Sequence, residues 1–299
     1  MLEQSATKQG SGPSTLESDR CATPSCRLQN PIIIEQGNAL RPISLPDIWA
    51  YRELLYFLIW RDLKIRYKQT ALGVAWVILQ PLLMTIIFTV FLGKLVRVPS
   101  DGVPYLLLVY TGLMPWTFFS NAILYAGNSL VANTNLVTKV YFPRAIIPAA
   151  AVGARLVDFG VAFIIMVGLL MYYGVSPGWN LFMLPALVVL ITLLSLGFGL
   201  WTSAMNVRYR DVAIILPVFV QLWMFASPVV YPLNLVPQRW RWLYSINPTV
   251  GIIEGFRSSV LNLPFDWVAI SSSALITTSL LLYSLFAFRK MERHFADIV

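Results

Sequence analysis

The stretch LFMLPALVVLITLLSLGFGLWTSAM, from Leu181 to Met205, contains no charged side chain. A helix needs about 20 apolar residues to cross the hydrocarbon core of a bilayer, which is about 30 Å thick. Inside lipid, a single segment satisfies its own backbone hydrogen bonds only as a helix. We therefore predict a transmembrane helix here, and the number of similar stretches decides the fold.

The composition of the whole chain is that of a membrane protein. Hydrophobic residues make up 57% of its 299 residues and charged residues 12%, and the mean hydropathy is +0.68. Soluble domains carry about 25% charged residues. We predict an all-α polytopic membrane protein with six transmembrane helices, at residues 73–95, 104–127, 145–173, 181–205, 212–230 and 268–288.

The basic residues indicate how these spans are oriented. The net charge is +8, from 22 Lys and Arg against 14 Asp and Glu. Cytoplasmic loops of membrane proteins are enriched in Lys and Arg, which explains this excess better than binding to nucleic acid. Cations gather before span 1, between spans 2 and 3, between spans 4 and 5, and after span 6. The opposite side carries fewer, with Arg239, Arg241 and Arg257 spread over a long loop. Both termini are therefore expected in the cytoplasm.

The region before the first span divides into two parts. Residues 1–45 are mostly polar, begin with a Ser/Thr/Gly/Pro-rich stretch and lack the pattern of a signal peptide, so we predict a flexible tail. Residues 46–72 favour a helix in which Arg61, Lys64 and Lys68 fall near one face. We predict an N-terminal amphipathic interface helix on the cytoplasmic leaflet. The alternative is a juxtamembrane helix in solvent.

The segment between spans 5 and 6 contains a short apolar helix. Thr249–Leu261 has a helical pattern but would be only about 20 Å long. Asn247 and Pro248 mark its start. We therefore predict short re-entrant helices between spans 5 and 6. The alternative is a folded external loop that lies flat on the bilayer.

Motifs of covalent chemistry are absent from the sequence. It has no phosphate-binding G-x-x-x-x-G-K-[ST] loop, no G-x-S-x-G and no H-E-x-x-H. Cys21 and Cys26 lie in the tail, and His294 is the single histidine, so no metal site is expected. We predict a chain that is not an enzyme, binds no cofactor itself and, as a transporter, takes its energy from another chain.

Arg155 and Asp158 form the one clear charged pair inside a predicted span. They are three residues apart, so they share a helix face and can pair. Such a pair either stabilises the structure or belongs to a proton relay. A relay needs further ionisable groups along a path, and none is evident, which favours the structural interpretation.

The decapeptide NLVTKVYFPR, Asn135–Arg144, lies on the predicted cytoplasmic side between spans 2 and 3. Asn133 or Thr134 can cap a short helix. The helix can run over Leu136–Tyr141, and Pro143 ends it. A short exposed helix joined to two spans is what a cytoplasmic motor subunit could push. The alternative is an ordinary linking loop.

An ordered set of stretches resembles the membrane subunit of ABC-2-type polysaccharide exporters, the family that carries lipid-linked O-antigen, capsular polysaccharide or teichoic acid across the inner membrane. The resemblance covers the chain from about residue 50 to its end and implies that residues 73–299 form a six-span ABC-2 type transmembrane domain. The stretches are LIWRDLKIRYKQTALGVAWVILQPL (58–82), NLVTKVYFPR (135–144), ARLVDFGVAF (154–163), NVRYRDV (206–212), NPTVGIIEGFR (247–257) and MERHFADIV (291–299).

The resemblance implies two cytoplasmic elements. One is a coupling helix that docks on a separate ATP-binding subunit through Asn135, Leu136, Lys139, Phe142, Pro143 and Arg144. The other is a turn near the gate with Asn206, Arg208, Arg210 and Asp211, whose alternative interpretation is ordinary positive charge beside a span. In this family, Arg155 and Asp158 would be structural or would shape the inner mouth.

The resemblance also implies an assembly and a location. A homodimer of this chain, with two copies of an ABC nucleotide-binding subunit, would move lipid-linked polysaccharide through a conduit between the two copies. ATP and Mg would be bound by the partner subunit. The assembly would lie among the lipids of the bacterial inner membrane, and no nucleic acid partner is implied.

Aromatic residues in the predicted spans are candidates for lining such a conduit, because sugar rings stack on aromatic faces. For each of them the alternative is packing or anchoring at the membrane interface. The candidates are Trp76, Phe88, Trp116, Phe119, Trp223 and Phe225.

Two other functions compete with polysaccharide export. One is ABC-2 export of a drug or lipid, against which the long Pro-rich external segment and the polysaccharide-type terminus argue. The other is a stand-alone ion-coupled carrier or membrane enzyme, against which the lack of an acid and histidine constellation argues.

Overall fold

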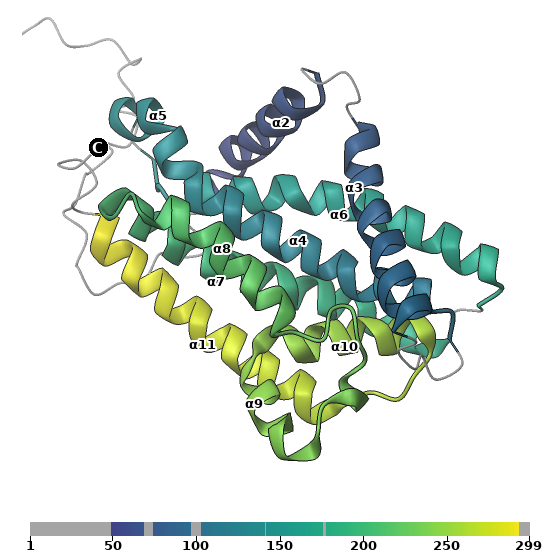
Figure 1. Cartoon of the computed structure of the whole chain (residues 1–299). Coiled ribbons are helices and arrows are strands. Elements are labelled where there is room, and N and C mark those ends of the chain that lie inside the picture. The colour runs from purple at the N-terminus through teal and green to yellow at the C-terminus, as the bar shows by residue number, and fades with distance from the viewer. Residues whose placement is uncertain (1–48, 69–73, 97–102, 141, 176–177, 293–299) are drawn as a thin grey trace, which may run out of the picture. The chain divides into compact units, whose positions relative to one another are not determined.

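Five helices of the computed structural model are long and apolar enough to cross a membrane (Figure 1). No strand occurs among the residues that the structure describes, so the predicted all-α membrane fold is confirmed. The five candidate spans are Ala75–Leu95, Tyr105–Ala132, Ile146–Tyr173, Trp179–Arg208 and Trp267–Glu292.

The structure describes residues 49–68, 74–96, 103–140, 142–175 and 178–292. These all belong to one compact unit. The predicted tail 1–45 and the ends of the predicted interface helix, 46–48 and 69–72, lie outside the described residues, as do Tyr141 and residues 293–299.

The fifth predicted span, residues 212–230, contains a shorter helix than expected. α8 covers Val212–Phe225, which is 14 residues or about 21 Å of helix. Beyond it the chain turns at 226–228, because Pro228 has no backbone N–H to continue a helix. Val229 and Val230 are buried but not helical. The apolar character of this end therefore reflects packing inside the protein.

The first predicted span changes its winding partway along. α3 (Val74–Phe88) contains Pro81 and is continued by the π-helix η1 (Thr89–Leu95). The Thr85 hydroxyl donates a hydrogen bond to the Pro81 carbonyl at 2.7 Å, so its polar group is satisfied within the helix. α3 and η1 together form the first candidate span.

α4 (Tyr105–Ala132) is the central helix of the fold. Tyr110 and Phe119 are fully buried on it, and the Tyr110 hydroxyl donates to the Ala162 carbonyl at 2.9 Å. α11 (Trp267–Glu292) packs on the outside of the bundle against α7 and α10. The helices that contact α4 are α3, α6 (Ile146–Tyr173), α7 (Leu184–Arg208), α8 and α10 (Pro248–Leu261).

The short helices predicted between spans 5 and 6 are α9 (Arg241–Ile246) and α10. Asn247 caps α10, because its side chain accepts a hydrogen bond from the Thr249 amide at 3.1 Å. Almost every side chain of α10 is buried, and the helix contacts α4, α7 and α11. α10 is therefore packed within the helix bundle, which argues against a loop lying flat on the bilayer.

α2 (Arg52–Lys68) forms the described part of the predicted interface helix and packs along α6. Leu58 is buried against the bundle, whereas Phe57 and Trp60 are exposed on other faces. Because apolar residues occur around the whole helix, its amphipathic character is weaker than predicted.

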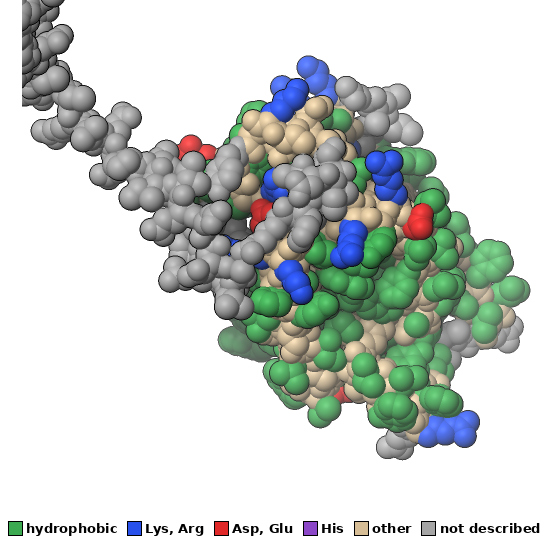
Figure 2. All heavy atoms as spheres, turned by 90° about the vertical axis from the view of Figure 1, so that its left-hand side faces the viewer, with side chains coloured by type: hydrophobic (Ala, Val, Ile, Leu, Met, Phe, Trp, Pro, Cys, Tyr) green, Lys and Arg blue, Asp and Glu red, His purple; other side chains and the backbone are tan. Residues whose placement is uncertain are grey.

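The short elements gather at two ends of the bundle (Figure 1). α5 (Thr134–Lys139), the turn between α7 and α8, and the last turn of α11 lie at one end, whereas α9 lies towards the other. Figure 2 looks onto the side that carries α5 and shows Lys and Arg side chains gathered on one part of it, with hydrophobic side chains covering much of the rest.

Candidate functional site

α5 is a short helix that presents a small polar face. It follows α4 directly after Asn133, whose amide donates to the Ser129 carbonyl at 2.8 Å and makes no side-chain cap for α5. Asn135 and Lys139 are exposed, together with Thr138, whereas Leu136 is only partly exposed. Two of the predicted contact residues, Asn135 and Lys139, are therefore accessible at this end of the molecule.

Phe142 and Arg144 hold the segment after α5 in place. Phe142 is only 7% exposed and belongs to a cluster of buried side chains that includes Val137 and Leu58. The Arg144 backbone N–H donates to the Glu292 carboxylate at 3.1 Å, and its guanidinium donates to the Glu292 carbonyl at 2.8 Å. The expectation that Phe142 faces a partner is corrected, because its ring fills the protein's own core.

Pro143 begins the turn into α6. It is partly exposed, and its carbonyl accepts a hydrogen bond from the Ile146 amide at 3.1 Å. α5 is thus connected to α4 on one side and, through a short fixed turn, to α6 on the other. A displacement of α5 therefore acts on both long helices.

The predicted turn between spans 4 and 5 contains one residue that does not belong to it. Asn206 is 3% exposed and lies within α7. Its amide donates to the Gly127 carbonyl at 2.9 Å and to the Asn128 side chain at 3.0 Å, both on α4. Asn206 therefore joins α7 to α4, which corrects its assignment to the turn. Arg208, Arg210 and Asp211 are exposed there.

Arg155 and Asp158 form an ion pair on α6, with 3.0 Å between nitrogen and oxygen. Asp158 also accepts hydrogen bonds from Arg66 and Tyr67 on α2. Both guanidinium groups lie over the ring of Tyr125 on α4, at 4.8 Å for Arg66 and 3.9 Å for Arg155. The expected pair is thus the centre of a larger cluster that ties α2, α4 and α6 together.

The surroundings of this cluster keep its phenol protonated. Burial, followed by the hydrogen bond to Asp158, raises the pKa of Tyr67 above its ordinary value. Tyr67 therefore remains a hydrogen-bond donor to Asp158 at neutral pH. A neutral donor and two cations around one carboxylate fit a structural junction better than a proton relay.

Two candidate conduit aromatics are part of the core. Trp116 is 4% exposed and Phe119 is 0% exposed. Their rings pack against Trp223 on α8, with centroids 6.4 and 5.2 Å away, and Phe198 on α7 completes the cluster. Because they fill the space between α4, α7 and α8, Trp116 and Phe119 do not line a conduit, and the expectation is corrected.

The other aromatic candidates differ in exposure. Trp76 on α3 is 55% exposed and Phe225 on α8 is 59% exposed. Phe88 and Trp223 are only partly exposed. Trp76 and Phe225 therefore remain accessible for stacking, whereas Trp223 contributes an edge to the core cluster.

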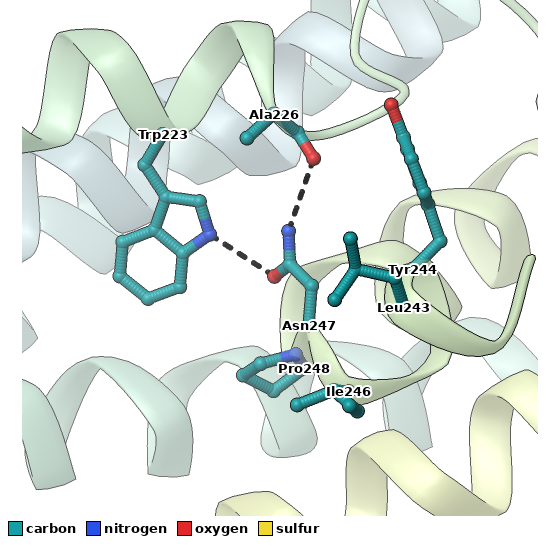
Figure 3. A pocket seen from close by; sticks show the side chains of 7 residues that line it. All are labelled: Trp223, Ala226, Leu243, Tyr244, Ile246, Asn247 and Pro248. Carbon is teal, nitrogen blue, oxygen red and sulfur yellow. Dashed lines mark hydrogen bonds between the residues drawn. The ribbon is translucent and has the colours of Figure 1, made fainter. Parts of the chain in front are cut away.

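An open pocket of about 470 Å³ lies where α8 ends and α9 passes into α10 (Figure 3). The Trp223 indole donates to the Asn247 side-chain oxygen at 3.0 Å, and the Asn247 amide donates to the Ser227 hydroxyl at 2.9 Å. These polar groups serve the protein itself, so the pocket offers a mainly apolar wall. Its lining residues are Trp223, Ala226, Leu243, Tyr244, Ile246, Asn247 and Pro248.

Arg257 is an internal residue that the sequence reasoning placed in an external loop. It is 2% exposed on α10, where its guanidinium donates to the Val229 carbonyl at 2.6 Å and the Tyr231 carbonyl at 2.9 Å. It also pairs with Glu254 at 2.8 Å. Arg257 therefore fastens the irregular chain after α8 to α10. Its sequence signal is the three-residue spacing from Glu254 inside an apolar helix.

Known proteins resemble this chain over most of its length. The sequence profile of the family described as ABC-2 type transporter matches residues 53–261, which include α2 to α10. The O-antigen export system permease protein RfbA of Myxococcus xanthus is 29% identical over 214 residues, which cover 71% of this chain and 82% of that protein.

Two further relatives match a larger part of this chain. The O-antigen export system permease protein RfbA of Klebsiella pneumoniae is 28% identical over 248 residues, covering 83% of this chain and 95% of that protein. The polysialic acid transport protein KpsM of Escherichia coli is 24% identical over 238 residues, covering 78% of this chain and 91% of that protein. The similarity therefore extends over nearly the whole length of these relatives.

Proposed function

Because the chain belongs to the ABC-2 type transporter family, we propose that it is the membrane subunit of an ATP-driven exporter of lipid-linked polysaccharide. The names of its relatives support this substrate class, since they are permeases for O-antigen export and a transport protein for polysialic acid. The helical membrane fold agrees with such a function.

The energy for export comes from a separate subunit in this proposal. The sequence lacks a phosphate-binding loop, so two copies of an ABC nucleotide-binding subunit bind ATP and Mg. Two copies of this chain form the membrane part as a homodimer, with the conduit between them. The chain itself carries out no covalent chemistry.

The observation that carries the proposal is the way α5 is held. Its polar face, with Asn135 and Lys139, is exposed, whereas Phe142 and Arg144 fix the following turn to the core and to α11. Docking of the ATP-binding subunit on that face moves α4 and α6, to which α5 is directly connected. Asn206 and the Asp158 cluster pass this movement to α7 and α2.

The proposed location is the bacterial inner membrane, with the end that carries α5 in the cytoplasm. The cations around α5, α2 and the end of α11 support this orientation. A protease-sensitive tag at either terminus is then cleaved only when the cytoplasmic side is opened. Cleavage of the tag in intact spheroplasts would show that the protein has the opposite orientation.

The coupling role is tested by Lys139→Glu. In the proposal this substitution lowers ATP-dependent glycan export and the stimulation of the ATPase by the membrane subunit, while the melting temperature in detergent stays unchanged. Lys94→Glu, an exposed lysine on η1, is the matched control and leaves export intact. Normal export by Lys139→Glu, with normal ATPase stimulation, would remove α5 from the coupling path.

The substrate class is tested in the cell of origin. A strain without this chain accumulates lipid-linked glycan in the cytoplasmic leaflet if the exported molecule is a polysaccharide. Normal glycan at the cell surface, with accumulation of a drug or lipid instead, would contradict the proposal. Both outcomes assume an ABC exporter. Stoichiometric co-purification of an ABC ATPase with the gently solubilised chain would support that assumption and argue against a stand-alone carrier.

A further inference from the structure

The central helix α4 has a single narrow face that the described part of the protein covers only in part. From Leu107 to Leu130, all residues of the helix are buried except six. These six are partly or fully exposed. Their separations along the chain alternate between three residues and one, so they share one side of the helix. They are Thr117, Ser120, Asn121, Leu124, Tyr125 and Asn128, hereafter the α4 polar face.

This face lies between α3 and α8. α6 and α7 pack against α4, α3 contacts both α4 and α6, and α8 contacts both α4 and α7. Going around α4, the side left open is therefore the one between α3 and α8, and Figure 1 shows α4 between these two helices.

The composition of the face does not suit contact with lipid tails. Five of its six residues are polar, in a helix that belongs to a candidate span. The Thr117 hydroxyl donates to the Leu113 carbonyl at 2.7 Å, and the Ser120 hydroxyl donates to the Thr117 carbonyl at 3.1 Å, which leaves both oxygens able to accept. No hydrogen bond to the Asn121 side chain occurs among the described residues. An amide without a partner in hydrocarbon costs several kcal/mol, on the order of 4 or more.

The face is continuous with polar groups at the end that carries α5. The Asn128 side-chain oxygen accepts from Asn206 at 3.0 Å. Tyr125 lies under the guanidinium groups of Arg66 and Arg155. The polar surface therefore extends from the charged cluster on α2 and α6 into the middle of a candidate span, which gives a hydrated substrate an entry.

We infer that the α4 polar face contacts the hydroxyl groups of the glycan as it passes through the membrane, an inference that rests on the proposed function. Hydroxyls of a sugar chain both donate and accept. The Asn121 amide can do both, and the hydroxyl oxygens of Ser120 and Thr117 can accept. Such groups exchange partners with each successive sugar and with water, without one deep binding site. Trp116 and Phe119, which neighbour this face in sequence, are buried and cannot stack on sugars. Passage along α4 is thus guided by hydrogen bonds.

The inference is tested by thiol labelling of single-cysteine variants. The background carries Cys21→Ser and Cys26→Ser, which removes both native cysteines. Asn121→Cys places the probe on the α4 polar face, and Leu275→Cys, at a side chain 70% exposed on α11, is the lipid-facing control. A charged methanethiosulfonate reagent should label Asn121→Cys about tenfold faster, because a reactive thiolate forms in water and not in lipid.

Shielding by the substrate is the second measurement. Labelling of Asn121→Cys should be slower in cells that make the glycan than in cells whose glycan synthesis is blocked, whereas Leu275→Cys should not respond. Equal labelling with and without the glycan would overturn the inference, and so would labelling as slow as that of the control. A spontaneous disulfide between two Asn121→Cys chains that forms equally fast with and without the glycan would also overturn it, because the face would then be a closed contact between copies and not a wall of the conduit.

Failure of the inference is distinguishable from failure of the proposed function. If the deletion strain accumulates lipid-linked glycan but labelling ignores the glycan, polysaccharide export stands and the contact surface lies elsewhere. If no glycan accumulates, the proposed function fails, and with it the premise of the inference.

Discussion

The guanidinium of Arg257 on α10 donates a hydrogen bond to the carbonyl of Val229, 2.6 Å away, in the irregular chain that follows α8. The same side chain reaches the Tyr231 carbonyl and Glu254. A cation that is 2% exposed thus supplies the hydrogen bonds that a regular helix would have made for Val229 and Tyr231. The short α8 is stable in this fold because Arg257 satisfies the carbonyls beyond its end.

Replacing Arg257 by Met should therefore strongly destabilise the protein. The change leaves the carbonyls of Val229 and Tyr231 and the Glu254 carboxylate without their donor, a loss of about 3–5 kcal/mol when a buried pair is broken. The melting temperature in detergent measures it. Arg241→Met, at an exposed arginine on α9, is the control and should melt like the parent protein. Equal melting of both variants would mean that Arg257 does not hold this segment.

Asp158→Leu should detach α2 from the bundle. It removes the acceptor for Arg66 and Tyr67 and leaves Arg155 without its carboxylate in the protein interior, at a cost of about 3 kcal/mol or more. We expect a lower melting temperature and faster proteolysis within α2. Asp62→Leu breaks only a partly exposed pair with Arg61, which is worth about 0–1 kcal/mol. Similar behaviour of the two variants would argue against a junction at Asp158.

Gly112→Ala should interfere with the contact between α4 and the chain after α8. A Cβ at Gly112 would lie 2.2 Å from the Val229 carbonyl oxygen and 2.7 Å from the Arg257 guanidinium. The backbone carbonyl cannot move away cheaply, so we expect a lower melting temperature. Gly160→Ala on α6 meets nothing within 4 Å and should be neutral or stabilising, by up to about 1 kcal/mol of helix propensity. The prediction fails if Gly112→Ala melts as high as Gly160→Ala.

Phe142→Ala should weaken the anchoring of the segment after α5 in the core, which can be measured without any partner. Removing a buried phenylalanine side chain costs about 3–5 kcal/mol, so the melting temperature falls before any partner is added. Lys139→Glu, on the exposed face, should leave melting unchanged. An unchanged melting temperature for Phe142→Ala would place its ring outside the core and restore it as a contact residue.

The parts of the fold that depend on local pattern could be predicted from sequence. The uncharged run from Leu181 to Met205 fixes α7 within a few residues of its observed bounds. Asn247 and Pro248 give the start of α10, because the cap and the first helical position have their own residue preferences. The spacing of Arg155 and Asp158 gives their ion pair. Each of these features is decided by residues close together in the chain.

The features that were missed depend on contacts distant in sequence. Arg66 and Tyr67 reach Asp158 across 92 and 91 residues, and no local pattern indicates which carboxylate they meet. The burial of Phe142 likewise depends on Leu58 and other distant residues of its cluster. When a whole segment is predicted to contact a partner, the sequence alone does not tell which of its residues are exposed and which are buried. The fold is needed for that.

Arg257 illustrates a different difficulty. Its spacing from Glu254 equals that of Arg155 and Asp158, so the sequence contains a signal for a second internal pair. The same spacing is common on exposed helices, and α10 is too short to span a bilayer. Only the packing of α10 among α4, α7 and α11 decides that this pair is internal.

The hydrogen bonds between Arg144 and Glu292 join residues that are 148 positions apart. At roughly 5–20 residues per second, a ribosome needs about 7–30 s to make the chain between them. During that interval α4 and α5 have already been synthesised and α6 follows early, but the support for the turn after α5 is still missing. The surface that an ATPase would recognise is therefore completed only when the last span has been synthesised and has joined the bundle. We therefore expect an unfinished chain to bind the proposed ATP-binding subunit less well than the complete one.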